Sequence, residues 1–106
     1  MDRFKYRAYD ETYKRFLYRT LIEPKEASLN WEQCTGLKDK NGKLIYENDK
    51  IKDWKNNRFV IAFDGQYAQF VAKDENGWVS PIERDVLEDC EIIGNIHENA
   101  DLLGEE

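Results

Sequence analysis

The stretch of this chain that decides its fold is Trp31-Glu-Gln-Cys-Thr-Gly-Leu-Lys-Asp-Lys-Asn-Gly-Lys-Leu-Ile-Tyr-Glu-Asn-Asp49. It starts with the alternating pattern of a β-strand, bends at Gly36 and reverses at Asp39-Lys-Asn-Gly42 before a second apolar run. Asn and Gly tolerate the positive φ angles that tight reversals need. The stretch therefore predicts two strands joined by a tight turn, and it contains no recognisable catalytic motif.

Strand patterns and turn signals continue on both sides of this stretch. Upstream, residues 4–9 and 13–19 predict a hairpin, because alternation at period two with aromatic residues is typical of half-buried strands. A third strand is expected over residues 29–35. Downstream, short strands follow one another at intervals of about ten residues over 49–79, and a closing strand is expected at residues 90–96.

These elements predict a mainly β protein, folded as a twisted meander or small barrel, with an N-terminal hairpin and one or two short helices near 81–88 and 99–103. The length of 106 residues predicts a single domain over 1–106. The expected core is Phe4, Tyr6, Trp31, Leu37, Ile45, Ile51, Val60, Ala62, Phe70, Ile92 and Ile96. The expected structural turn positions are Gly36, Asn41, Gly42, Asn48, Asn76 and Gly77.

Charge is distributed unevenly along the chain, whose formal net charge is −6. Residues 1–82 hold 15 Lys/Arg and 13 Asp/Glu, whereas residues 83–106 hold one Arg and nine Asp/Glu. This acidic C-terminal segment, which includes the closing strand, is either a solubilising end or a contact for a basic surface, such as the N-terminal hairpin of its own or a neighbouring chain. No apolar run has the length of a membrane span, and no signal peptide precedes the hairpin, so a soluble, cytoplasmic protein is expected.

The sequence offers little for catalysis or metal binding. His97 is the only histidine, and neither Ser28 nor Ser80 lies in a nucleophile motif. Cys34 and Cys90 match no zinc spacing and are expected to be buried free thiols, with a redox or ligand pair as the alternative. The first Asp-x-Asn-Gly turn lacks both outer ligands of a calcium loop, and the second has Glu83 at the last ligand position but Ala72 at the first. We therefore expect no enzyme activity, no catalytic residues, no metal and no cofactor.

Basic and aromatic residues are interleaved in residues 1–19, and residues 50–58 add a second basic stretch. Cations beside aromatic residues on a small barrel are typical of single-stranded nucleic-acid binding, through phosphate contacts and base stacking. The alternative, which strict alternation favours, places the aromatic residues in the core and the cations on the solvent side of the same strands. The candidate contact residues for nucleic acid or another partner are Arg3, Lys5, Arg7, Lys14, Arg15, Arg19, Lys50, Lys52, Lys55 and Arg58.

Four ordered motifs give the chain a family resemblance. They are Phe4-Lys-Tyr-Arg-Ala-Tyr-Asp10, residues 31–42, Ile45-Tyr-Glu-Asn-Asp49 and Cys90-Glu-Ile-Ile-Gly-Asn-Ile96, and together they resemble the YopX family of bacteriophage and prophage proteins over residues 3–103. Tyr9 stands where the family usually has Trp, and Asn48 stands where it has Gly. Asn is the best non-Gly residue for a left-handed position. The resemblance implies a mostly β fold partly similar to an SH3-like barrel, a phage or prophage origin, and neither catalytic residues nor a cofactor.

Two hypotheses from different functional classes follow. The first is a non-enzymatic phage or prophage accessory protein that acts as a protein–protein interaction module in the bacterial host cytoplasm, with homo-oligomers as a variant because a small open sheet leaves edges that can pair. The second is a single-stranded nucleic-acid-binding small barrel that uses the basic and aromatic N-terminal hairpin. It requires Tyr9, Tyr13 or Tyr18 to be exposed beside the cations. No membrane partner is expected.

Overall fold

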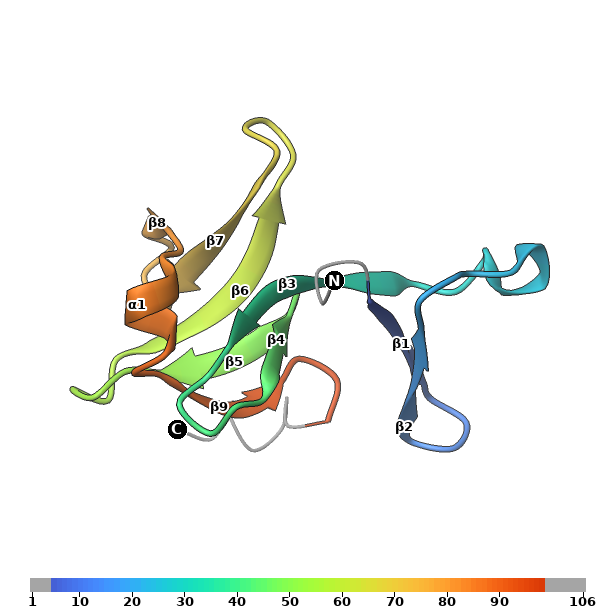
Figure 1. Cartoon of the computed structure of the whole chain (residues 1–106), viewed down its shortest axis with the longest axis horizontal. Coiled ribbons are helices and arrows are strands. Elements are labelled where there is room, and N and C mark those ends of the chain that lie inside the picture. The colour runs from blue at the N-terminus through green and yellow to red at the C-terminus, as the bar shows by residue number, and fades with distance from the viewer. Residues whose placement is uncertain (1–4, 99–106) are drawn as a thin grey trace.

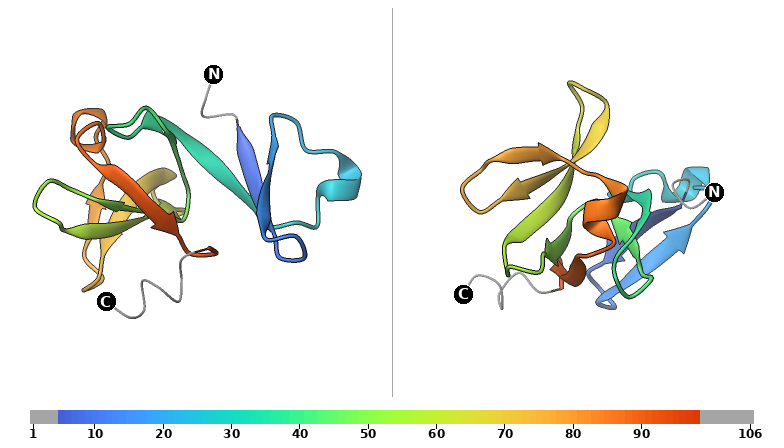
Figure 2. Two further views of the ribbon diagram at one scale, coloured as in Figure 1. Left: turned by 90° about the horizontal axis from the view of Figure 1, so that it is seen from below. Right: turned by 60° about the vertical axis from the view of Figure 1, so that its left-hand side comes forward.

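Antiparallel β-strands make up most of the structure, and one of them, β3, runs through both of its halves (Figures 1 and 2). The computed structural model describes residues 5–98. In chain order its elements are β1 (Tyr6–Asp10), β2 (Arg15–Arg19), a short 3-10 helix (Pro24–Glu26), β3 (Trp31–Lys38), β4 (Leu44–Tyr46), β5 (Asp49–Lys52), β6 (Arg58–Asp64), β7 (Gln69–Asp74), β8 (Val79–Pro81), α1 (Arg84–Leu87) and β9 (Glu91–Asn95). The mainly β fold expected from the sequence is confirmed.

The strands form two antiparallel sheets. The N-terminal sheet has the order β2-β1-β3-β4, and the second sheet, which curls into a half-barrel, has the order β8-β7-β6-β5-β9. The first residues of β3 pair with β1, whereas Cys34 and Lys38 pair with β4. The strand thereby holds the N-terminal hairpin to one side of the half-barrel, as the left view of Figure 2 shows.

Three tight turns, at residues 39–43, 53–57 and 74–78, share one arrangement. The Asp side chain at the first position accepts hydrogen bonds from the backbone N–H groups two and four residues further on. The fourth position has a positive φ, with values of 79° at Gly42, 67° at Asn56 and 87° at Gly77. Gly and Asn enter that region with the least strain, so these turns follow from local sequence.

The expected turn positions are found in the structure. Gly36 and Asn48 also have positive φ angles, 83° and 69°. Asn41 and Asn76 lie in two of the tight turns, where each donates its backbone N–H to the Asp side chain. The helix expected near residues 81–88 is the single turn α1, and the one expected at 99–103 lies outside the described residues.

The core lies inside the half-barrel and receives side chains from both sheets and from α1. Its buried members are Ile45, Ile51, Ile61, Ala72, Leu87 and Cys90, and Leu37, Phe59, Phe70, Ile82 and Ile92 pack against them. Ile45 and Ile51 were expected in the core and are fully buried, and the expected Leu37, Phe70 and Ile92 line it.

For three residues, Val60, Ala62 and Ile96, the predicted place in the core is wrong. Ile61 on β6 is fully buried in the core, so its neighbours Val60 and Ala62 point to the opposite face of the sheet. Residues 59–63 are apolar throughout, and alternation therefore could not tell one face from the other. Ile96 is 39% exposed because it follows the end of β9. The remaining three do not enter the central cluster: Tyr6 and Trp31 are half-buried in the N-terminal sheet, and Phe4 lies outside the described residues.

Adjacent substitutions on β6 test the assignment of its two faces. We expect Ile61→Ala to lower the free energy of unfolding by about 2–5 kcal/mol, because it leaves a cavity in the core. We expect Val60→Ala, on the outer face, to lower it by about 1 kcal/mol or less. Urea denaturation followed by circular dichroism measures both values, and equal losses would contradict the assignment.

Candidate functional site

A buried cation, Arg7 on β1, lies where the N-terminal sheet meets the half-barrel. Its Nε donates to Glu32 Oε1 at 2.8 Å, and its Nη2 donates to Asp49 Oδ1 at 2.8 Å and to the Glu47 carbonyl at 3.1 Å. The ring centroids of Phe16 and Tyr46 lie 4.3 and 4.8 Å from its guanidinium carbon. The charge is therefore surrounded by two carboxylates, a carbonyl and two π faces, which together replace its hydration.

Glu32 extends this arrangement to the C-terminal end of the described chain. Its Oε2 lies 2.8 Å from His97 Nε2 and also accepts a hydrogen bond from Asn48 Nδ2. The His97 ring stacks on Tyr9 with the ring centroids 5.1 Å apart. We call Arg7, Glu32, Asn48, Asp49 and His97 the junction cluster, because its members come from β1, β3, the β4–β5 turn, β5 and the segment after β9.

Within the junction cluster, burial and the neighbouring opposite charges shift the pKa values of Arg7 and Asp49 in opposite directions. Burial alone would lower the pKa of Arg7, but Asp49 and Glu32 outweigh it, so the pKa lies above its ordinary value. Burial raises the pKa of Asp49, while Arg7 and the Tyr46 backbone N–H oppose that rise. Burial also raises the pKa of Tyr46 to about 12. These contacts fix the position of the N-terminal hairpin, and the phenol beside them stays neutral at physiological pH.

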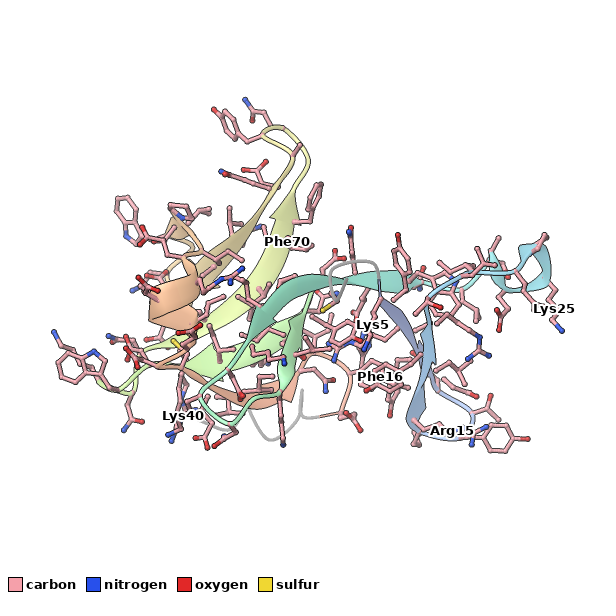
Figure 3. The ribbon with its side chains drawn as sticks, in the orientation of Figure 1. Lys5, Arg15, Phe16, Lys25, Lys40 and Phe70 are labelled. Atoms are coloured by element: carbon pink, nitrogen blue, oxygen red, sulfur yellow. The ribbon has the colours of Figure 1, made fainter. Side chains whose placement is uncertain are left out.

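The hairpin cations predicted as contact residues do not form one surface. The prediction of Arg7 as a contact residue is wrong, because Arg7 is buried. Alternation placed it on a solvent-facing side of β1, but that side is covered where the sheet meets the half-barrel. Arg19 Nη2 forms an ion pair with Glu26 Oε2 at 2.8 Å. Lys14 and Arg15 are exposed at the far end of the hairpin, which Figure 3 shows for Arg15. Lys5 is half-buried, and Arg3 lies outside the described residues.

Of the tyrosines required by the nucleic-acid hypothesis, one is covered and two are exposed. Tyr9 is half-buried beneath His97, whereas Tyr13 and Tyr18 are 70% and 56% exposed. The guanidinium of Arg15 lies 5.2 Å from the centre of the Tyr13 ring. The hairpin thus keeps one exposed pair of a cation and an aromatic ring, while Arg7 and Arg19 are committed to ion pairs.

The second basic stretch contributes to a different surface. Lys50 and Arg58, together with Lys73, line a groove of about 900 Å³ on the half-barrel sheet. We call it the outer groove, and its lining is Lys50, Asn56, Asn57, Arg58, Phe59, Val60, Lys73, Asp74, Glu75, Asn76 and Ile93. Of the other two predicted cations, Lys52 lies 3.6 Å from Glu91, and Lys55 lies 4.8 Å from the centre of the Trp54 ring.

Lys73 is a groove residue that the sequence did not predict. Lys50 and Lys73 lie directly opposite Val60 on the two neighbouring strands, so the three side chains form a row across β5, β6 and β7. Because this row depends on strand register and on the choice of face for β6, no local signal around Lys73 could have shown it.

The two cysteines are buried free thiols, as expected. Cys90 Sγ donates to the Val86 carbonyl at 3.2 Å, and burial raises the pKa of this thiol, which makes it a weak nucleophile. Within residues 5–98 no group of three potential ligands is placed to hold a metal ion. No helix of the described chain is long and apolar enough to cross a membrane.

Comparison with known proteins places this mainly β chain in a family. It matches the family described as YopX protein over residues 26–104, and it belongs to that family. The crystal structure of protein EF1440 from Enterococcus faecalis is similar, with 26% sequence identity, a TM-score of 0.63, and coverage of 93% of this chain and 96% of that chain. No curated protein matches the chain.

Removal of the buried cation tests its role in joining the two halves. We expect Arg7→Met to lower the free energy of unfolding by about 3–5 kcal/mol, because Glu32 and Asp49 would lose their compensating charge. Arg19→Met, at the more exposed ion pair, serves as the matched control and should have a much smaller effect. Guanidinium denaturation at neutral pH measures both, and similar losses would contradict a special role for Arg7.

The pH dependence of the same variant tests the cause of its loss. Because burial raises the pKa of Asp49, the folded state binds this proton more tightly than the unfolded state, and the stability contributed by this group falls as pH rises through the folded pKa. Without Arg7 the pKa would rise further. The loss caused by Arg7→Met should therefore be smaller at about pH 5 than at about pH 8. An equal loss at both pH values would show that uncompensated carboxylates are not its cause.

Two truncations test the contact between the C-terminal segment and the hairpin. A chain that ends at Ile96 should be about 1–3 kcal/mol less stable than a chain that ends at Glu98, because only the longer chain keeps the stack of His97 on Tyr9 and its hydrogen bond to Glu32. His97→Ala in the longer chain should reproduce most of the difference. Denaturant midpoints provide the measurement, and indistinguishable truncations would show that this contact contributes nothing to stability.

Proposed function

We propose that this protein is a non-enzymatic accessory protein of a bacteriophage or prophage, and that it acts in the cytoplasm of the bacterial host as a protein–protein interaction module. Its membership of the YopX family supports the phage or prophage origin. The observation that carries the proposal is a two-stranded arm of aromatic character that projects from the half-barrel (Figure 1). We define the arm as residues 62–70, the outer ends of β6 and β7 with the turn between them.

The arm carries three aromatic side chains. Phe63 and Phe70 are cross-strand partners with ring centroids 5.2 Å apart in an edge-to-face arrangement. Phe70 packs against the core at the base of the arm, where Figure 3 marks it, whereas Phe63 is 45% exposed. Tyr67 in the turn is 66% exposed. Exposed aromatic residues of this kind are enriched at protein interfaces, where their burial contributes much of the binding energy.

The strand edges of the arm support the same proposal. β5 pairs with β6 as far as Val60, and β8 pairs with β7 only over Val71–Lys73. The outer residues of the arm therefore pair only with each other among the described strands. Open edges of this type accept an additional strand, either from a partner protein or from a second copy of the chain. A homo-oligomer is thus one form that the interaction can take.

Affinity purification with matched variants tests this function. The full chain carries a tag in a nuclease-treated lysate of the bacterial host, and captured proteins are quantified by mass spectrometry. We expect one specific partner, or a second copy of the chain, to be retained by the wild type and lost with Phe63→Ser plus Tyr67→Ser. Tyr13→Ser plus Leu21→Ser removes side chains that are even more exposed, 70% and 78%, from the N-terminal half and should retain the partner.

Two results would overturn the proposal. One is a wild-type chain that stays monomeric in size-exclusion chromatography and captures nothing above the tag alone. The other is a partner that both variants retain, or both lose, to the same extent. Thermal unfolding of each variant shows whether a loss of capture reflects the arm or a loss of fold.

A further inference from the structure

The outer groove and the two most exposed tryptophans occupy the same end of the half-barrel sheet. Asn56 and Asn57 line the groove from the β5–β6 turn, and residues 74–76 line it from the β7–β8 turn. Both turns lie at the end of the sheet opposite the arm, because β6 and β7 run antiparallel between them. Trp54 belongs to the first turn and is 79% exposed, and Trp78 closes the second and is 75% exposed.

The lining of the outer groove suits an anion that also has an apolar surface. Lys50 and Lys73 flank Val60 in one row, so their strands are separated by about 10 Å, two strand spacings. Ile93 adds to the apolar floor, and Arg58 supplies a third cation. Within residues 5–98 neither Lys50 nor Lys73 forms an ion pair. Asp74 Oδ1 accepts two backbone hydrogen bonds of its own turn, which leaves Glu75 as the more available acid of the lining.

We propose that the outer groove binds single-stranded nucleic acid, with the phosphates held by Lys50 and Lys73 and the bases stacked on Trp54 and Trp78. A basic groove next to exposed aromatic rings is the arrangement that holds single strands without sequence preference. The exposed tryptophans favour this ligand over an acidic peptide, because nucleic-acid bases stack on aromatic rings and carboxylates do not. This site lies on the half-barrel and not on the N-terminal hairpin, where Arg7 and Arg19 form ion pairs.

The negative net charge of the chain does not oppose local binding. Residues 83–106 account for the negative sum, whereas residues 1–82 hold more Lys/Arg than Asp/Glu. Screening at physiological salt limits the reach of each charge to about 8 Å. Residues 91–95 of the acidic segment form β9 beside β5, but the acids of the groove lining are Asp74 and Glu75, against three cations, and the affinity should fall steeply with salt.

Fluorescence anisotropy on the full chain tests the proposal. The probes are a labelled oligothymidylate and a labelled oligouridylate of about 15 nucleotides, titrated from about 50 to 200 mM salt. We expect the logarithm of the binding constant to fall against log salt with a slope of about −1.4, as two phosphate contacts require. Trp fluorescence should be quenched as the exposed rings stack on bases, while the half-buried Trp31 continues to emit.

Two double charge reversals separate the groove from the hairpin. Lys50→Glu plus Lys73→Glu should weaken binding by about tenfold or more. Lys14→Glu plus Arg15→Glu makes the same change in net charge at the exposed end of the hairpin and should change the affinity by less than about twofold. Trp54→Ala plus Trp78→Ala, which leaves all charges in place, should also weaken binding by about tenfold.

The outcomes that would overturn the proposal are distinct. They are no binding by the wild type at the lowest salt, equal losses in the groove and hairpin variants, or unchanged affinity in the tryptophan variant. Equal affinity for a duplex or for a polyglutamate peptide would likewise overturn it, by indicating a non-specific anion surface or an acidic protein partner. None of these results depends on the arm, so they are independent of the protein capture experiment.

Discussion

The buried charge of Arg7 is the constraint on which the relation between the two halves of the molecule depends. An arginine that loses its hydration needs compensating charge and hydrogen bonds in fixed positions. Glu32 and Asp49 meet this need only when β1, β3 and the start of β5 are in their observed register. A slip of β1 by one residue would turn Arg7 to the opposite face and leave both carboxylates without it. The cluster therefore selects one arrangement of the N-terminal sheet on the half-barrel.

This constraint also divides the basic residues into two groups. Arg7 is buried where the N-terminal hairpin meets the half-barrel and donates a hydrogen bond to Asp49. Arg19, on the second strand of the hairpin, forms an ion pair with Glu26. The half-barrel sheet needs no cation for its core, which is apolar on its inner face. Lys50 and Lys73 lie on its outer face, opposite Val60.

Local features of the fold could be predicted from the sequence, and features that depend on three-dimensional contacts could not. The turns at Gly42 and Gly77 follow from side chains within four residues, so their signal is complete in the sequence. The inner face of β6 is undetermined locally because residues 59–63 are all apolar. Arg7 alternates like a surface residue, and its acidic partners lie 25 and 42 residues away. Alternation assigns a side chain to a face, but it does not reveal whether a second sheet covers that face.

The two turns that carry the exposed tryptophans are each closed by hydrogen bonds to an Asp side chain of the same turn. In each, an Asp side chain closes the turn with hydrogen bonds to two backbone N–H groups, and a residue at positive φ completes the reversal. A ring mounted on such a turn loses less conformational entropy on binding than a ring on a mobile loop, because its backbone is already ordered. Asp53 and Asp74 thus order both turns. They set the strand reversals, and they hold Trp54 and Trp78 at one end of a sheet whose outer face carries Lys50 and Lys73.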